Sequence, residues 1–240
     1  MKSQLFAIAA LACGLSLAAH AETSLVYELT DSQGKTTEQT YTLHGRWVRV
    51  DYNVPDAPRH LILDTGFLIM YVVDSAQESF FTFGQSPHHQ GEQLASTAGQ
   101  QAAPQRMVER GSAAATLAPT GQRESVAGIR CNLVDEVVDG KTVAEHCLAD
   151  PAVLGMSQRE MITMARLIDF AREWSDPDWI AIQRNEQFVS IRSRPADGVA
   201  TFVLKSVSHT TPPADYFRVP ASYRKRETGS DYRGLLTGSK

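Results

Sequence analysis

The sequence predicts a mainly β protein of the α+β kind: a curved antiparallel sheet, or half-open barrel, with one amphipathic helix packed in or over its concave face. The sheet is predicted because short apolar runs separated by turn residues fill positions 25–83 and return over 126–207. The helix is predicted because positions 157–174 carry apolar residues at helical spacing. The 240 residues are 42% hydrophobic and 21% charged, which is typical of a globular protein.

The first 21 residues have the features of a secretory signal peptide. Lys2 precedes a short apolar run, and the small residues Ala19 and Ala21 stand where signal cleavage needs them. We therefore expect cleavage after Ala21 and export to the periplasm. The alternative is a lipoprotein signal that uses Cys13. No later segment has roughly 18 uninterrupted apolar residues, so we expect no transmembrane span in the mature chain.

An antiparallel meander follows the expected cleavage site. Its predicted strands are 25–30, 36–43, 46–52, 60–63, 67–73 and 79–83. In the third of these, Val48 and Val50 share one face while polar and aromatic residues share the other, which indicates a half-buried strand. Residues 67–73 are apolar at every position, so we expect both faces of that strand to be covered. The cover is either a filled core or a wall that faces a ligand.

Residues 85–125 differ from the rest of the chain. They contain few apolar side chains larger than Ala and are rich in Gln, Ser, Gly, Ala and Pro. Such a segment buries too little apolar surface to offset the entropy lost on ordering, so we expect a mobile insert. It contains His88 and His89, but adjacent histidines on a strand point in opposite directions. Because no third ligand has suitable spacing, we predict no metal site.

Two cysteines, Cys131 and Cys147, remain after removal of the signal peptide. Strand-like runs at 126–138 and 143–148 flank Asp139-Gly140, which is a strong hairpin signal. Folding the chain there brings the two cysteines nearly opposite each other in an oxidising compartment. We therefore predict a disulfide, worth roughly 3 kcal/mol for a loop of this size. The alternative is a redox pair, although the usual C-x-x-C spacing is absent.

One helix of about 17 residues is predicted from a capping box at Ser157–Glu160 to a stop at 175–177. Its apolar stripe needs a surface to pack against. Three further strands are predicted at 179–183, 187–194 and 199–207. The polar residues 225–240 are expected to form a frayed tail.

Seven apolar residues of the predicted strands and helix are candidates for lining a ligand cavity. They are Leu68, Met70, Val72, Phe81, Met161, Met164 and Ile168. A curved sheet wrapped round a helix leaves an apolar hollow wherever the helix does not fill it. Core packing is the competing explanation for the same methionine and aromatic stripe.

Several short motifs resemble those of a known family in their order and spacing. They are Gly45–Asp51, Leu61–Asp64, Leu68–Asp74, Glu124–Cys131, Cys147–Asp150, Leu204–Val207 and Phe217–Tyr223. Together they resemble the exported bacterial DUF4412 proteins, which are of unknown function, and more distantly the lipoprotein carriers and acceptors of the LolA/LolB type. The resemblance covers most of residues 25–224. It implies one domain over 22–224, built as a half-open barrel with a helical lid over an apolar hollow, which holds acyl chains in the carriers.

The catalytic motifs in the chain are few. Asp64-Thr65-Gly66 matches the signature of aspartic proteases, whose chemistry needs two such carboxylates facing each other. The chain has one copy, and Asp-Thr-Gly is also a common turn sequence. Serine-hydrolase, zinc-protease and phosphate-loop motifs are absent from the sequence after residue 21. We therefore predict no enzyme, no catalytic residues and no cofactor.

Three functional hypotheses follow from the sequence. The first is a non-enzymatic periplasmic protein that holds an apolar ligand, a lipid or a lipidated protein, in the hollow of a curved sheet. The second is an envelope interaction or sensor module with a filled core, which uses residues 85–125 to contact a protein partner. The third is an aspartic protease centred on Asp64. A net charge of −4 gives no reason to expect nucleic acid as a partner.

Overall fold

The computed structural model describes residues 22–31, 33–53, 58–84, 115–174, 187–198 and 200–226. Within these residues, twelve strands form one sheet in the order β12-β6-β5-β4-β3-β2-β1-β11-β10-β9-β8-β7. Every neighbouring pair is antiparallel except β12 with β6. The expected signal peptide and strand 179–183 lie outside the described residues.

The strands have the following bounds in chain order. They are β1 Glu22–Asp31, β2 Thr36–His44, β3 Trp47–Tyr52, β4 Arg59–Asp64, β5 Ile69–Asp74, β6 Ser79–Gly84, β7 Thr116–Val126, β8 Ile129–Val138, β9 Lys141–Ala149, β10 Val189–Pro195, β11 Ala200–Thr210 and β12 Arg224–Lys225. A short 3-10 helix, η1 (Pro151–Leu154), and the α-helix α2 (Gln158–Trp174) connect β9 to the segment before β10.

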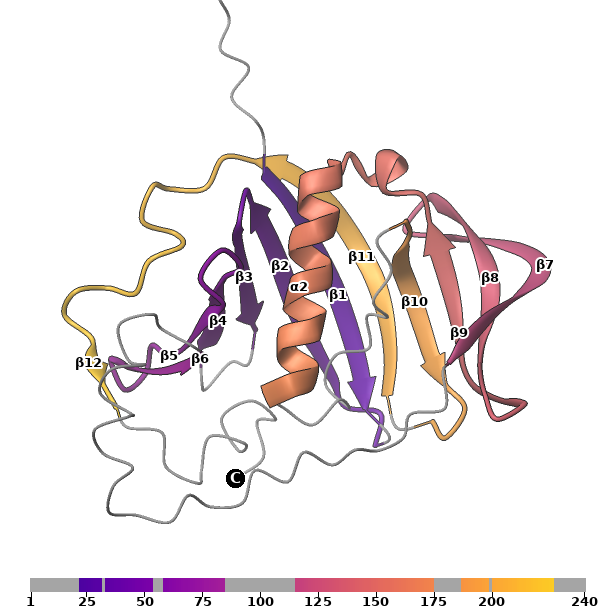
Figure 1. The fold of residues 1–240 in the computed structure, drawn as a ribbon, viewed down its shortest axis with the longest axis horizontal. Helices are drawn as coiled ribbons and strands as arrows, with labels where there is room; N and C mark the ends of the chain where they lie inside the picture. The colour runs from indigo at the N-terminus through magenta and orange to yellow at the C-terminus, as the bar shows by residue number, and fades with distance from the viewer. Residues whose placement is uncertain are drawn as a thin grey trace, which may run out of the picture.

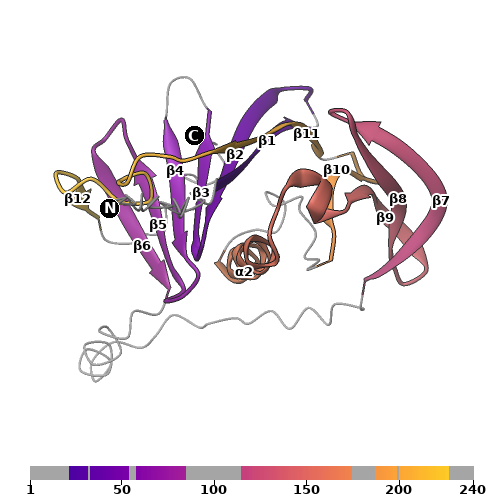
Figure 2. The same ribbon diagram turned by 90° about the horizontal axis from the view of Figure 1, so that it is seen from above.

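The sheet is strongly curved and does not close, because β12 and β7 remain at opposite ends of the strand order. The view from above shows α2 inside the curve, with the strands arranged around it (Figure 2). In the front view α2 crosses the middle of the sheet, in front of β1 and β2 (Figure 1). The predicted fold class, a curved open antiparallel sheet with one helix on its concave face, is thus confirmed for the described residues.

Helix α2 begins and ends as the sequence predicts. Ser157 Oγ accepts a hydrogen bond from the backbone N–H of Glu160, and the Glu160 carboxylate accepts one from the Ser157 N–H at 2.7 Å. These reciprocal bonds satisfy amide groups that would otherwise lack partners in the first turn. The cap therefore fixes the point at which the chain enters the helix.

The turn before β5 differs from the expectation that residues 67–73 form one covered strand. Strand β5 starts at Ile69, while Phe67 and Leu68 lie in the preceding turn and are 51% and 48% exposed. Leu68 has a backbone φ of 53°, which ends strand geometry there. Its carbonyl oxygen lies against Gly84, where an added Cβ would approach it to 2.0 Å, so only glycine fits opposite this turn.

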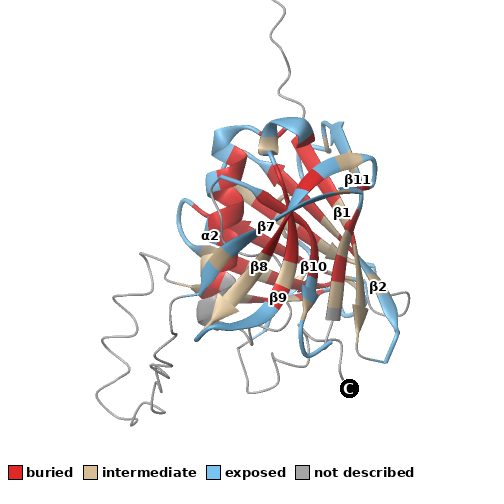
Figure 3. Cartoon of the chain, turned by 90° about the vertical axis from the view of Figure 1, so that its right-hand side faces the viewer, coloured by how far each residue is buried: buried red, intermediate tan, exposed pale blue. Residues whose placement is uncertain are grey.

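The last part of the expected mobile insert also differs from the expectation. Residues 116–126 form β7, which pairs with β8. Most of its side chains are exposed, as the pale blue ribbon shows in Figure 3. An edge strand of this kind gains backbone hydrogen bonds from its neighbour without needing apolar side chains, so its composition did not reveal it. Residues 85–114 lie outside the described residues.

The predicted disulfide is present between Cys131 on β8 and Cys147 on β9, with the two Cα atoms 5.3 Å apart. The hairpin turn lies at Asp139 and Gly140, both of which have positive φ. The disulfide joins neighbouring strands near the end of the sheet at which β7 is the edge strand. It therefore cross-links the two strands of the β8–β9 hairpin.

The segment after β11 runs across the convex face of the sheet and ends in β12, as the gold trace at the left of Figure 1 shows. The Tyr216 hydroxyl donates to Asp51 at 2.8 Å, and Arg49 donates to the Tyr216 carbonyl at 2.7 Å with its guanidinium over the tyrosine ring. Residues 224–225 then pair with β6, so the expected frayed tail starts as a short strand. Residues 227–240 lie outside the described residues.

Candidate functional site

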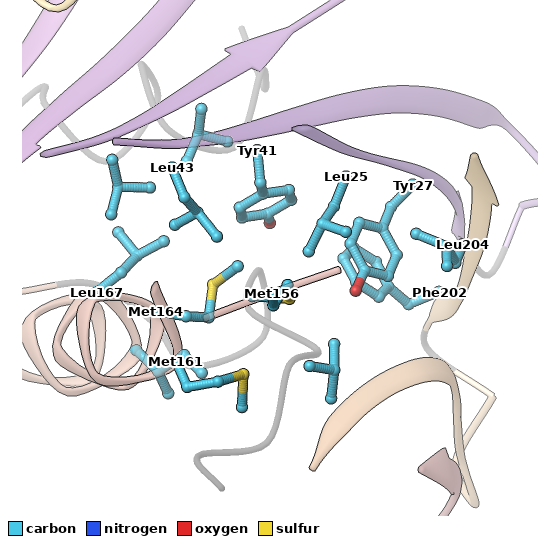
Figure 4. Packing of buried hydrophobic residues seen from close by; sticks show 14 of the residues in the cluster. Leu25, Tyr27, Tyr41, Leu43, Met156, Met161, Met164, Leu167, Phe202 and Leu204 are labelled. Carbon is cyan, nitrogen blue, oxygen red and sulfur yellow. The ribbon is translucent and has the colours of Figure 1, made fainter. Parts of the chain in front are cut away.

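The concave face of the sheet carries buried apolar side chains on every strand from β1 to β11. One cluster of buried residues includes inward-facing side chains from every strand from β1 to β11. Figure 4 shows part of it, with Leu25, Tyr27, Tyr41 and Leu43 on the sheet facing the methionines of α2. Because side chains alternate along a strand, every second residue of each strand is available for this face. The face is therefore mainly apolar, and α2 lies across it.

Helix α2 and the residues just before it supply the other side of this contact. Met156, Met161 and Met164 are each at most 6% exposed, and Leu167 and Ile168 are fully buried. Methionine side chains are unbranched and flexible, so they adapt to partners of different shape. The contact between helix and sheet is thus rich in methionine, the side chain that adapts best when a different group packs against it.

Hydrogen bonds made by Glu160, Thr163 and Arg166 attach α2 to one half of the sheet. Glu160 accepts from the Thr23 N–H on β1 at 3.2 Å, the Thr163 hydroxyl donates to the Gly45 carbonyl at 2.7 Å, and Arg166 donates to the Thr65 carbonyl at 3.1 Å. The sheet partners in these bonds lie in β1 and in the turns that join β2 to β3 and β4 to β5. On the other half of the sheet, β8, β9 and β10 share the apolar cluster with α2.

Two hollows flank the start of α2. One, of about 550 Å³, is lined by Asp150, Pro151, Ala152, Met156, Gln158, Met161 and Gln187. The other, of about 640 Å³, is lined by Glu22, Leu43, His44, Gly45, Arg46, Trp47, Gly155, Ser157, Arg159 and Glu160. The first reaches two methionines of the apolar cluster, and the second reaches Leu43 of the same cluster. Both hollows therefore meet the apolar contact at the same end of the helix.

The seven residues proposed to line a cavity have different positions. Met70, Val72, Phe81, Met161, Met164 and Ile168 belong to the apolar cluster and are at most 5% exposed. Leu68 lies outside it, in the exposed turn before β5. The structure thus brings the helix candidates and three strand candidates to one surface. Whether a ligand occupies that surface stays a prediction.

Asp64, of the Asp-Thr-Gly sequence, is 3% exposed at the end of β4. One of its carboxylate oxygens accepts from the Gly66 N–H at 2.9 Å, and the other lies 3.1 Å from the Arg46 guanidinium. The Thr65 hydroxyl donates to the Arg46 carbonyl at 2.8 Å. These are the contacts of an aspartate that caps its own turn.

A chain of polar side chains on β8, β9 and β10 has the residue types of a catalytic triad. The His146 ring lies 2.9 Å from the Glu136 carboxylate and 3.5 Å from the Ser190 hydroxyl. Ser190 is 1% exposed, and its hydroxyl donates to the Arg192 carbonyl at 3.1 Å. A serine held in this way inside the sheet cannot reach a substrate, so the arrangement stabilises neighbouring strands.

A charged cluster at the start of α2 was not predicted from the sequence. Glu22 is 6% exposed and lies 2.6 Å from the His44 ring, while Glu160 supplies the helix cap beside it. Burial raises the pKa of Glu22 above its usual value, the negative charge of Glu160 adds to that rise, and His44 opposes it. The three residues are far apart in sequence, and only the capping box around Glu160 left a local signal.

Metal binding has little support in the part of the chain that the structure describes. There, no group of three His, Cys, Asp or Glu side chains could hold a metal ion. His88 and His89 lie outside it. Among the described helices, none is long and apolar enough to cross a membrane.

Comparison with known proteins shows only remote similarity. No family model matches the chain, and no curated protein matches it. An uncharacterised conserved protein from Thermus thermophilus is 6% identical, with a TM-score of 0.47, over 88% of this chain and 92% of its own. The PNGF-II structure is 9% identical, with a TM-score of 0.44, over 91% of this chain but 33% of its own.

A third solved structure is the MucA/MucB complex of Pseudomonas aeruginosa. It is 10% identical with a TM-score of 0.41, over 84% of this chain and 56% of the matched chain. These likenesses are distant. This chain spans about a third of the PNGF-II chain and just over half of the MucA/MucB match. Likenesses this distant support no conclusion about function. The resemblance to the DUF4412 proteins stays a prediction.

Proposed function

We propose that this chain is an exported, non-enzymatic binding protein that holds an apolar ligand between α2 and the concave face of its sheet. The ligand class is a lipid or the acyl chain of a lipidated protein. The observation that carries the proposal is the apolar cluster that continues across all strands from β1 to β11 with α2 lying over it. Burying acyl chain there yields about 0.8 kcal/mol per CH₂ group.

The way α2 is attached supports this function. Its hydrogen bonds to Thr23, Gly45 and Thr65 hold it to β1–β5. The buried cluster that α2 shares with β8–β10 is apolar and includes Met161 and Met164. Apolar contacts are non-directional, so an acyl chain can replace them without leaving a polar group unpaired. The ligand would therefore enter between α2 and β8–β10, next to the hollow that reaches Met156.

A titration with a fluorescent fatty acid tests this proposal. We expect saturable binding at one site and its loss in Met164→Gln, which keeps the side-chain length but puts an amide in the apolar contact. Val73→Thr is the matched control, because Val73 is fully buried but lies outside the concave cluster. Absence of fatty acid binding by the parent protein, or equal loss in both variants, would contradict the proposal.

The lack of enzymatic activity belongs to the same proposal. The contacts of Asp64 with Gly66 and Arg46 support a role in the turn rather than in catalysis. We expect the protein to leave casein uncleaved at acidic pH. Cleavage that disappears in Asp64→Asn would favour the protease hypothesis instead.

The exposed strand β7 favours a second candidate function, a protein-interaction module. It stands at the end of the sheet and pairs on one side with β8. An edge strand can accept an extended peptide through backbone hydrogen bonds. Binding of envelope proteins that is lost when Gln122 is replaced by proline, without loss of fatty acid binding, would favour this function.

A further inference from the structure

The polar hollow beside α2 adjoins the apolar contact but differs from it in chemistry. It lies where β1 starts, where β2 turns into β3 and where α2 begins, and its volume is about 640 Å³. Most of its lining residues are charged or polar, while Leu43 joins it to the apolar cluster. An acyl chain alone cannot form hydrogen bonds or ion pairs with these charged and polar side chains.

The inner side of this hollow is acidic. Among the described residues, Glu22 Oε2 is buried without a hydrogen-bond partner, while Oε1 lies 2.6 Å from the His44 ring. Both oxygens of the neighbouring Glu160 are used, one by Thr23 and the other by Ser157. A buried carboxylate oxygen that lacks a donor is costly, and its burial raises the pKa of Glu22. Among the described residues, Glu22 Oε2 is therefore an acceptor whose hydrogen-bonding capacity is unused.

The outer side of the hollow is basic. Arg159 is exposed, and its guanidinium lies over Gly45, 3.7 Å from where a Cβ would stand. Arg46 is 46% exposed, contacts Asp64 and lies over the Trp47 ring. A guanidinium binds phosphate or carboxylate through two parallel hydrogen bonds. The hollow thus offers an acceptor for a cation inside and donors for an anion at its rim.

We propose that this hollow binds a zwitterionic group that carries a primary ammonium and a phosphate or carboxylate. The ammonium donates to Glu22 Oε2, and the anionic group accepts from Arg159. A lone anion would face the buried acid, and a lone cation would leave the arginine unused. Assigning the zwitterion to the headgroup of the bound lipid, an aminoethyl phosphate, rests on the proposed function, with Leu43 joining the two sites.

Calorimetric titration with O-phosphoethanolamine, ethanolamine and glycerol 3-phosphate tests the site, with the exported protein identified by its intact mass. We expect phosphoethanolamine to bind about 10-fold or more tightly than either half, since each charge-assisted bond contributes. Glu22→Gln and Arg159→Gln should each weaken it about 10-fold or more. Glu28→Gln, on the half-buried part of the same strand, and Arg130→Gln, at an exposed position, should leave it unchanged.

The outcomes separate this inference from the proposed function. Glycerol 3-phosphate that binds as tightly as phosphoethanolamine overturns the site, and so does a protein that does not bind phosphoethanolamine. Absence of phosphoethanolamine binding is the result expected if the terminal ammonium of a chain that starts at Glu22 already occupies the site. Arg159 is exposed, so its variant remains informative if Glu22→Gln does not fold. Fatty acid binding without phosphoethanolamine binding overturns this site alone, and the reverse overturns the apolar-ligand proposal alone.

Vesicles identify the source of the zwitterion. If the protein binds vesicles of phosphatidylethanolamine and free phosphoethanolamine displaces them, the zwitterion is a lipid headgroup. Phosphoethanolamine should not displace vesicles of phosphatidylglycerol from the protein. Binding of phosphoethanolamine without binding of phosphatidylethanolamine overturns the assignment to a lipid and leaves a site for a free zwitterion.

Discussion

Met161→Ala separates a ligand-binding contact from an ordinary core. Met161 is 2% exposed and belongs to the apolar cluster, so its truncation should lower the free energy of unfolding by about 3 kcal/mol, within the range for buried methionine. The cavity left behind can take about two methylene groups of a bound fatty acid, worth about 1.6 kcal/mol at 0.8 kcal/mol each. The fatty acid should therefore stabilise the variant more than it stabilises the parent.

The assay is urea unfolding with and without fatty acid at about 100 times its Kd, where binding adds about 2.7 kcal/mol to the parent. We expect a gain of about 4 kcal/mol in Met161→Ala, the sum of this and the extra methylene burial. Ile62→Ala is the control, because Ile62 is fully buried outside the concave cluster and should lose similar stability without extra gain. Equal ligand-induced gains in the two variants would refute the assignment of Met161 to the ligand contact.

Three further predictions concern the scaffold. Replacing Cys131 and Cys147 together by Ser should lower the free energy of unfolding by about 3 kcal/mol in urea, and an unchanged midpoint would count against the disulfide's role. Burial, with the Arg49 charge, lowers the pKa of His60 to about 4 in the fold, so stability should fall as pH drops from about 6.5 toward 4, by up to about 3 kcal/mol. His60→Gln should flatten that pH dependence, and the same slope in the variant would contradict this cause. Tyr216→Phe removes the bond to Asp51 and should lower the free energy of unfolding by about 1 kcal/mol in urea, and an unchanged midpoint would contradict a stabilising role for this bond.

Local signals explain what the sequence could predict. Helix α2 could be located because Ser157 and Glu160 form a capping box whose bonds are local. The disulfide hairpin could be located because Asp139 and Gly140 favour a tight turn between two apolar runs. In both cases the residues that decide the structure are close together in the chain.

Other features depend on contacts that local patterns do not contain. Phe67 and Leu68 are as apolar as the strand that follows, but packing of the Leu68 carbonyl against Gly84 places them in a turn. Strand β7 was missed because an edge strand is stabilised by its partner's backbone. The pairing of Glu22 with His44 joins β1 to the end of β2, and nothing in either short segment indicates it.

Native mass spectrometry of the gently purified, exported protein tests the central claim most directly. An apolar ligand held between α2 and the concave face predicts a protein ion with an additional lipid mass, which Met164→Gln loses and Val73→Thr keeps. A parent protein that carries no lipid, and that takes up none when phospholipid or fatty acid is added, would contradict the claim.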